Sequence, residues 1–193
     1  MNSTQQEIAN RFEEHARVLH ETARTRLSEI EKAADTIVRS LKNGGKVIVF
    51  GNGGSAADAQ HIAAELVGKF KMERQALPAI ALTTNTSIVT ALANDYGYDT
   101  VFSRQIEALA GPKDVVLGIS TSGNSSSVLE AIKAARRIGA GTIGITGGDG
   151  GQLAVAAEFT ITVPSANTPR IQEAHITIGH IICEIVEKAM ARE

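Results

Sequence analysis

Five short apolar runs recur along this chain, and the intervals between them are long enough to hold helices. The runs are residues 46–51, 79–82, 114–119, 141–145 and 159–163. Apolar runs of this length are typical of strands buried on both faces. Helical patterns cover residues 56–70 and 127–138, and a final one covers about 168–190. Because parallel strands need crossover connections, we predict an α/β fold with a five-stranded parallel sheet and helices on both faces.

A long helix is predicted ahead of the first strand. Between about Glu7 and Leu41, apolar residues recur by threes and fours among charged ones, and Asn43 followed by two glycines ends the pattern. With 193 residues and 43% hydrophobic content, the chain has the size of one domain, so we predict a single domain over residues 1–193. A helix this long exceeds what one small sheet can cover. We therefore expect residues 1–43 to mediate oligomerisation.

Composition disfavours several classes of function. A net charge of −2 and 4% aromatic residues provide neither the basic surface nor the stacking residues of a nucleic-acid-binding protein. The single cysteine, Cys183, lies in an apolar helical pattern and is expected to be buried rather than nucleophilic. No apolar run approaches the ~18 residues of a membrane span, and the N-terminus is unlike a signal peptide. We expect a cytoplasmic protein that binds neither membrane nor nucleic acid.

Two loops rich in glycine and hydroxyl groups follow the first and third runs: residues 51–55 (GNGGS) and 120–125 (STSGNS). In parallel sheets, ligands bind beyond the carboxyl ends of the strands. Glycines let the backbone approach a ligand, and Ser55 is expected to cap the next helix, where free N–H groups favour an anion. Either loop alone is more often a simple turn. Two of them after different strands favour a phosphate site.

Other glycine-loop sites fit less well. Gly51, Gly53 and Ala56 have the spacing of a dinucleotide fingerprint, but residues 83–85 (TTN) supply no acidic residue after the second strand. No Gly-Lys-Ser/Thr sequence follows any glycine loop, which argues against a nucleoside triphosphatase.

Four residues suggest metal binding or acid/base chemistry. His61 and Glu65 are four residues apart, which on a helix places both side chains on one face. Exposed pairs at this spacing are usually solvated contacts, but apolar neighbours suggest a largely buried helix. A lone histidine such as His180 in an apolar helix is more often a core residue, yet Gln172 on the same helix adds an oxygen ligand. With the two loops, they predict a phosphosugar site.

These motifs, in this order, make the chain resemble the sugar isomerase (SIS) family, and within it the branch that isomerises phosphorylated heptoses. The similar segments are 51–61, 93–95, 120–125 and 170–175, and the resemblance covers essentially the whole chain. It implies a flavodoxin-like SIS fold and a homotetramer. It also implies interconversion of sedoheptulose 7-phosphate and D-glycero-D-manno-heptose 7-phosphate, the first step toward the nucleotide-activated heptose of bacterial surface polysaccharide.

The resemblance also implies roles for individual residues. It implies one zinc ion per subunit, with His61, Glu65, Gln172 and His180 as the ligands. The residues that would line the sugar phosphate are Asn52, Gly53, Gly54, Ser55, Glu65, Asn94, Asp95, Ser120, Thr121, Ser122, Ser125 and Gln172. Glu65 is expected to move the carbon-bound proton and His180 to act at oxygen, with the reverse assignment open. A zinc ion that polarises the carbonyl would compete for the same side chains.

Two positions depart from the family pattern, and two other functions remain alternatives. Lys69 stands where an arginine is common, and Pro169 where some members have an aspartate. A non-enzymatic SIS-domain protein that binds the replication initiator shares both loops, but lacks the carboxylate and imidazole matching Glu65 and His180. A phosphosugar-sensing regulatory domain would usually be fused to a DNA-binding segment.

Helix lengths predict that the site is shared between subunits. Ser55 and Glu65 would lie ~15 Å apart along one helix, and Gln172 and His180 ~12 Å apart along another. An extended heptose 7-phosphate spans only about 10 Å from phosphorus to C1. We therefore expect a site at a subunit interface, with some groups from a neighbouring chain.

Overall fold

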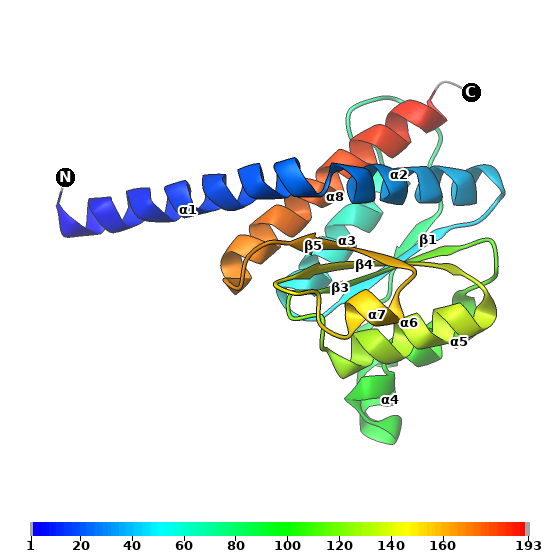
Figure 1. Ribbon diagram of the computed structural model, residues 1–193. Coiled ribbons are helices and arrows are strands. Elements are labelled where there is room, and N and C mark those ends of the chain that lie inside the picture. Colours follow the sequence, from blue (N-terminus) through cyan, green and yellow to red (C-terminus); the bar gives the residue numbers. More distant parts are fainter. Residues whose placement is uncertain (1, 192–193) are drawn as a thin grey trace.

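A five-stranded parallel sheet forms the centre of the protein (Figure 1). The computed structural model describes residues 2–191. The strands are β1 (Val47–Gly51), β2 (Ala79–Ala81), β3 (Val115–Ser120), β4 (Gly141–Gly147) and β5 (Phe159–Val163). Their order across the sheet is β2-β1-β3-β4-β5, with every neighbouring pair parallel. The predicted fold class is confirmed, because each of the five apolar runs forms a strand.

Helices cover both faces of the sheet and divide its side chains between two cores. One layer holds α2 (Leu27–Lys42), α3 (Gly54–Val67) and α8 (Thr168–Met190), and the other holds α5 (Ser103–Leu109), α6 (Ser126–Ile138) and α7 (Leu153–Ala156). Val47 and Val49 of β1 pack in the first core, whereas Ile48 and Phe50 pack in the second. Successive strand residues point to opposite faces, so a strand covered on both sides needs an unbroken apolar run.

The long N-terminal helix is present, with a break that the sequence pattern did not indicate. It consists of α1 (Ser3–Thr25) and α2, separated by Arg26, whose φ of −127° and ψ of 16° are not helical. The side chain of Arg26 donates from Nε to the carbonyl oxygen of Thr162 at 2.8 Å, which ties the break to β5. Beyond it, α1 extends past the sheet, and its buried residues are only Val18 and Thr22 (Figure 1).

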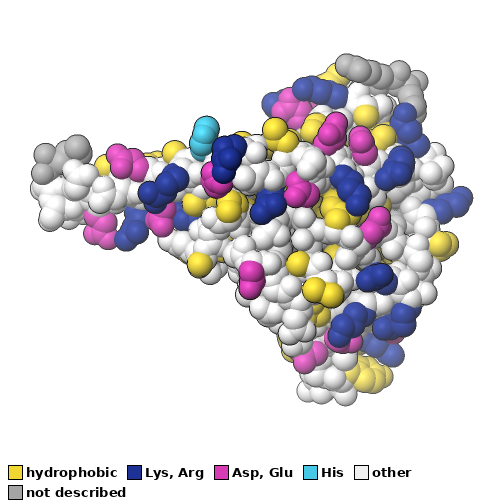
Figure 2. Space-filling model, viewed as in Figure 1, with side chains coloured by type: hydrophobic (Ala, Val, Ile, Leu, Met, Phe, Trp, Pro, Cys, Tyr) yellow, Lys and Arg dark blue, Asp and Glu magenta, His cyan; other side chains and the backbone are white. Residues whose placement is uncertain are grey.

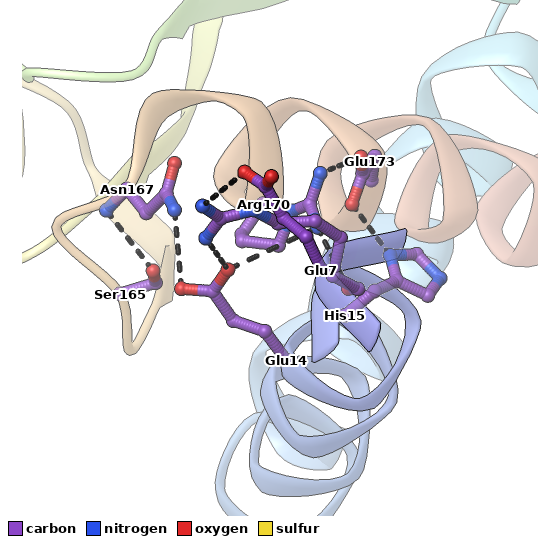
Figure 3. A network of polar contacts seen from close by, with 8 residues as sticks. Glu7, Glu14, His15, Ser165, Asn167, Arg170 and Glu173 are labelled. Atoms are coloured by element: carbon purple, nitrogen blue, oxygen red, sulfur yellow. Dashed lines mark hydrogen bonds and ion pairs between the residues drawn. The ribbon is translucent and has the colours of Figure 1, made fainter. Parts of the chain in front are cut away.

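A polar network joins α1 to the beginning of α8 (Figure 3). Arg170 donates from Nη1 to the carbonyl oxygen of Arg11 at 2.8 Å and pairs through Nη2 with Glu173 at 2.6 Å. The other carboxylate oxygen of Glu173 lies 2.6 Å from Nδ1 of His15. Because α8 carries two of the predicted site residues, this network links the projecting helix to the helix that positions them.

Three further short elements outside the predicted set lie between β2 and β3, and a fourth lies between β4 and β5. They are α4 (Thr86–Tyr96), a 3₁₀ turn η1 (Tyr98–Thr100) and α5, while α7 follows the glycine-rich segment after β4. The visible surface carries side chains of both charge signs along α1 and α2 (Figure 2). None of the helices within residues 2–191 has both the length and the apolar content needed to cross a bilayer.

Candidate active site

Helices α3 and α8 lie side by side, and their close contact builds the site. A Cβ atom at Gly179 of α8 would lie only 2.9 Å from Cδ1 of Ile62 on α3, so glycine is what permits this approach. Near one end of the pair, Gly54 faces Gln172. Two turns further along, His61 faces His180. The two helices therefore run in the same direction and bring residues together in matched pairs.

Three potential ligands gather between these helices. The Nε2 atoms of His61 and His180 lie 2.9 Å apart, and Nε2 of His61 is 3.1 Å from Oε1 of Glu65. The potential ligand atoms of these three residues all lie within 4.8 Å of one another. The expected helical spacing of His61 and Glu65 on one face holds. The predicted burial of this helix is only partial, because the His61 side chain is 48% exposed and that of Glu65 23%.

This three-residue group has the chemistry of a zinc site. Two imidazole nitrogens and one carboxylate oxygen are a common catalytic zinc set, which leaves a fourth position for water or substrate. A tetrahedron with metal–nitrogen bonds of 2.0–2.1 Å has edges of about 3.3 Å. The separations of 2.9 and 3.1 Å need only slight opening to match it. The residues therefore fit a divalent metal ion.

Gln172 is not part of this group within one chain. Its carboxamide lies against the start of α3, where a Cβ atom added to Gly54 would be 2.3 Å from Nε2 of Gln172. Along α8, Gln172 and His180 are separated by ~12 Å. Gln172 is therefore placed beside the first glycine loop, and the sequence-predicted four-ligand set is only partly assembled by a single protomer.

The two hydroxyl-bearing loops meet at the carboxyl end of the sheet. Ser120, at the end of β3, is buried and donates from Oγ to Oγ of Ser125 at 3.3 Å, and its Oγ lies 3.5 Å from that of Ser122. Asn52 in the first loop donates from Nδ2 to Oγ of Ser127 at 3.0 Å. This contact, which the sequence motifs did not indicate, joins the first loop to the helix that follows the second.

Ser55 occupies a different position from the one predicted. Helix α3 begins at Gly54, and its N-cap is Gly53, with φ of 56° in the region that favours glycine. Ser55 is in the first helical turn and only 3% exposed, so the expectation that it caps the helix is wrong. The first-turn N–H groups of α3 still point toward the loop, and the favourable environment for an anion remains.

Asn94 and Asp95 lie exposed near the end of α4. Nδ2 of Asn94 donates to Oδ1 of Asp95 at 2.8 Å. The hydroxyl of Tyr98, just beyond α4, donates to Oδ1 of Asn52 at 2.9 Å, which connects this part of the chain to the first loop. Thr121, the remaining predicted substrate residue, lines a small cavity. That cavity of about 200 Å³ is lined by Thr121, Ser122, Gly147, Gly148, Asp149, Ser165, Ala166, Thr168 and Ile171.

Asp58 is a further residue near the three-residue group that sequence reasoning missed. Its Oδ2 atom is buried and has no hydrogen-bond partner within residues 2–191. Burial raises the pKa of Asp58 to about 6, and the nearby charge of His61 only partly offsets this effect. Asp58 could have been found from the sequence, because it stands one helical turn before His61 on the same predicted helix. A carboxyl group with this pKa exchanges protons near neutral pH.

Known proteins resemble this chain over nearly its full length. The SIS domain family matches residues 11–147. A phosphoheptose isomerase from Aquifex aeolicus is 56% identical over 184 residues, which cover 92% of this chain and 96% of the relative. A phosphoheptose isomerase from Geotalea daltonii is 53% identical over 188 residues, covering 97% and 98% of the two chains.

A solved structure is equally close in shape. The phosphoheptose isomerase of Neisseria gonorrhoeae superposes with a TM-score of 0.92 at 43% sequence identity, covering 96% of this chain and all of the other. The agreement extends over the long N-terminal helix as well as the sheet, since so little of either chain is left uncovered.

Proposed function

This chain belongs to the SIS domain family, among its phosphoheptose isomerases, and from that membership we propose that it interconverts sedoheptulose 7-phosphate and D-glycero-D-manno-heptose 7-phosphate. The observation that supports this most directly is the three-residue group of His61, Glu65 and His180, on helices that begin beside two hydroxyl-bearing loops. The group offers proton transfer and metal ligation, and the loops offer phosphate binding.

The reaction moves a carbonyl group between two neighbouring carbons. A base removes a proton from C1 while the C2 oxygen is protonated, which produces an enediol. A proton is then returned to C2 while the C1 hydroxyl loses its own, which produces the aldose. Glu65 is proposed to carry the carbon-bound proton and His180 to serve the oxygens. The reverse assignment is the alternative, and it uses the same two residues.

Zinc is the proposed metal, held by His61, Glu65 and His180, with Gln172 as the fourth expected ligand. When bound, the ion would polarise the substrate carbonyl. The protein side chains hold that carbonyl next to Glu65 and His180, while Ser55, Ser120, Ser122 and Ser125 bind the phosphate. Their hydroxyl groups and the N-terminal amides of α3 and α6 complement a phosphate without a fixed cation.

We further propose a homotetramer in which active sites are completed by neighbouring chains. The separation of Gln172 from the three-residue group supports this arrangement, because one small ligand cannot contact both ends of α8 in one protomer. The projecting α1 supports it too. Ile8 is 53% and Phe12 71% exposed there, and a helix that packs on little of its own chain is marginal in water. Light scattering after size-exclusion chromatography tests this, and a fully active monomer at nanomolar concentration would refute it.

The replication-initiator alternative finds no support among the high-identity relatives, which are phosphoheptose isomerases that this chain matches over nearly their full length. Both residues expected to be missing from such a protein, Glu65 and His180, are present here. As part of the same proposal, the product enters bacterial surface polysaccharide synthesis and the protein is cytoplasmic.

The decisive experiment is to incubate the purified protein with sedoheptulose 7-phosphate and follow heptose phosphate formation. We expect turnover that a strong chelator lowers by at least ~10-fold and that added Zn²⁺ restores. Turnover unaffected by thorough chelation would refute the zinc assignment alone. No turnover with or without zinc would refute the isomerase assignment.

A further inference from the structure

Glu187, near the end of α8, binds the backbone of the loop that follows α3. Its carboxylate accepts hydrogen bonds from the backbone N–H groups of Phe70, Lys71 and Met72, at 2.8, 2.7 and 3.0 Å. The residue is only 1% exposed. Burial would raise the pKa of Glu187, but the three N–H groups and Arg74 more than reverse this, so the pKa is lowered and the group stays charged.

Arg74 connects the same carboxylate to the end of α3. Its Nε atom lies 3.4 Å from Oε1 of Glu187, with the two side chains 2% and 1% exposed. Its Nη2 atom donates to the backbone carbonyl oxygen of Glu65 at 2.8 Å. Its Nη1 atom donates to the carbonyl oxygens of Gly68 and Gln75 at 3.0 and 2.9 Å. One buried ion pair therefore links the backbone of Glu65 to α8, the helix that carries His180.

The loop held by Glu187 also contacts His180 directly. The ring of Phe70 lies 5.4 Å from the imidazole of His180, centroid to centroid, at an interplanar angle of 32°. The imidazole of His61 is a second neighbour of the His180 ring, at 5.0 Å between centroids. The His180 ring thus contacts one ring from the loop and one ring from α3.

A buried ion pair seldom adds net stability, because its desolvation cost offsets the attraction between the charges. An apolar pair of the same volume would usually serve the fold equally well. However, an apolar pair could not accept hydrogen bonds from three backbone N–H groups or donate one to the backbone carbonyl oxygen of Glu65. The placement of this pair is therefore better explained by geometry than by stability.

We propose that Glu187 and Arg74 are positioning residues for the isomerase site. They set the spacing between Glu65 on α3 and His180 on α8, and they hold Phe70 against His180. This inference rests on the proposed function. Neither residue reaches the phosphate loops at the opposite end of the two helices, so their effect should fall on the chemical step and on metal binding rather than on substrate affinity.

The principal test compares two isosteric substitutions on one helix. Glu187→Gln keeps the shape but replaces one acceptor oxygen by an amide donor facing backbone N–H groups. Misplacement of reacting groups by about 1 Å can cost ~100-fold in rate, so we expect kcat to fall by at least ~10-fold with KM within ~3-fold. The matched control is Glu184→Gln. Glu184 contacts the same loop through the side chain of Lys71, at 2.8 Å, and not through the loop backbone. Its substitution should therefore leave kcat within ~2-fold of wild type.

A second readout is independent of turnover. Competition with a chromogenic chelator should show Zn²⁺ binding weakened ~10-fold or more in Glu187→Gln and unchanged in Glu184→Gln, as expected when the support of a ligand is lost. Wild-type kcat and zinc affinity retained in Glu187→Gln would overturn the inference. If the wild type does not isomerise the sugar, the proposed function fails. The zinc affinities of the same variants then still test whether Glu187 positions the metal ligands.

A third variant decides the matter if Glu187→Gln does not fold, as judged by circular dichroism and size-exclusion chromatography. Phe70→Leu keeps an apolar side chain in the loop and removes the ring beside His180. We expect it to lower kcat by ~5-fold or more with KM within ~3-fold, since the ring that contacts His180 is removed while the apolar contact with the core is kept. Unchanged kcat and zinc affinity in Phe70→Leu would then overturn the proposed positioning of His180.

Discussion

The Nε2 atoms of His61 and His180 lie 2.9 Å apart, although 119 residues separate them in the chain. A hydrogen bond at this distance requires one imidazole to carry a proton on Nε2 and the other to accept it there. Glu65 adds its carboxylate to the same space, 3.1 Å from His61. The chemistry of the site thus depends on how closely α3 and α8 pack.

Glu65→Gln and His180→Gln should each lower kcat by at least ~100-fold while the fold is retained. Each substitution removes a proton-transfer group or a metal ligand and keeps most of the side-chain volume. Steady-state kinetics with sedoheptulose 7-phosphate and circular dichroism on the same preparations measure the two effects. Activity within threefold of wild type in either variant would contradict the assigned roles.

Ser55→Ala and Ser122→Ala should raise KM more than they lower kcat. Hydroxyl groups that bind the phosphate equally well in the ground and transition states contribute to binding rather than to the chemical step. The exposed Ser126 provides a control in which Ser126→Ala leaves both parameters within ~2-fold. The reverse pattern, with kcat falling more than KM rises, would place the two serines at the reacting carbons.

Gly54→Ala should displace Gln172 without unfolding the protein. The new Cβ atom would lie 2.3 Å from Nε2 of Gln172, the flexible end of a side chain that can move away. We expect turnover to fall by ~10-fold or more and to match that of Gln172→Ala. The double variant should show no further loss, because both changes remove the same group. Fully additive losses would show that the two residues act separately.

A matched control for this prediction is Gly111→Ala. The nearest atom to a Cβ at Gly111, Oδ2 of Asp114, is an ordinary 3.8 Å away. We expect this variant to keep wild-type turnover and a melting temperature within a few degrees of wild type.

His175 should make the protein less stable in acid. The ring is 1% exposed, its Nε2 atom lies 3.1 Å from the carbonyl oxygen of Thr146, and burial lowers the pKa of His175 to about 4. Its pKa in the unfolded chain is about 6.5, so its contribution to stability is complete above pH ~6.5 and is lost as pH falls toward 4.

The measurement is the free energy of unfolding in urea at pH 7 and pH 5. We expect a smaller decrease between these pH values in His175→Gln than in wild type. The variant His20→Gln, which removes an exposed imidazole on α1, should keep the wild-type decrease. Equal decreases of the free energy of unfolding in all three proteins would show that protonation of His175 does not destabilise the fold.

The strands and the two loops could be predicted because their causes are local. Val47 to Phe50 are apolar at every position because both faces of β1 are covered, and that requirement is visible in the residues themselves. The helical spacing of His61 and Glu65 is equally local. The break at Arg26 was not predictable, because the hydrophobic period continues through it and the contact of Arg26 with Thr162 forms only in the tertiary structure.

The sequence by itself therefore determined the five strands, the longer helices, the two loops at the carboxyl edge and the residue types available for chemistry. Only the tertiary structure decided which of these residues meet. Close packing at Gly179 brings His180 to His61, whereas the length of α8 leaves Gln172 beside Gly54. No sequence motif indicates a role for Glu187 and Arg74, because that role depends on their burial and on the loop that they hold. Periodicity is encoded within each element, but distances between elements depend on how their side chains pack.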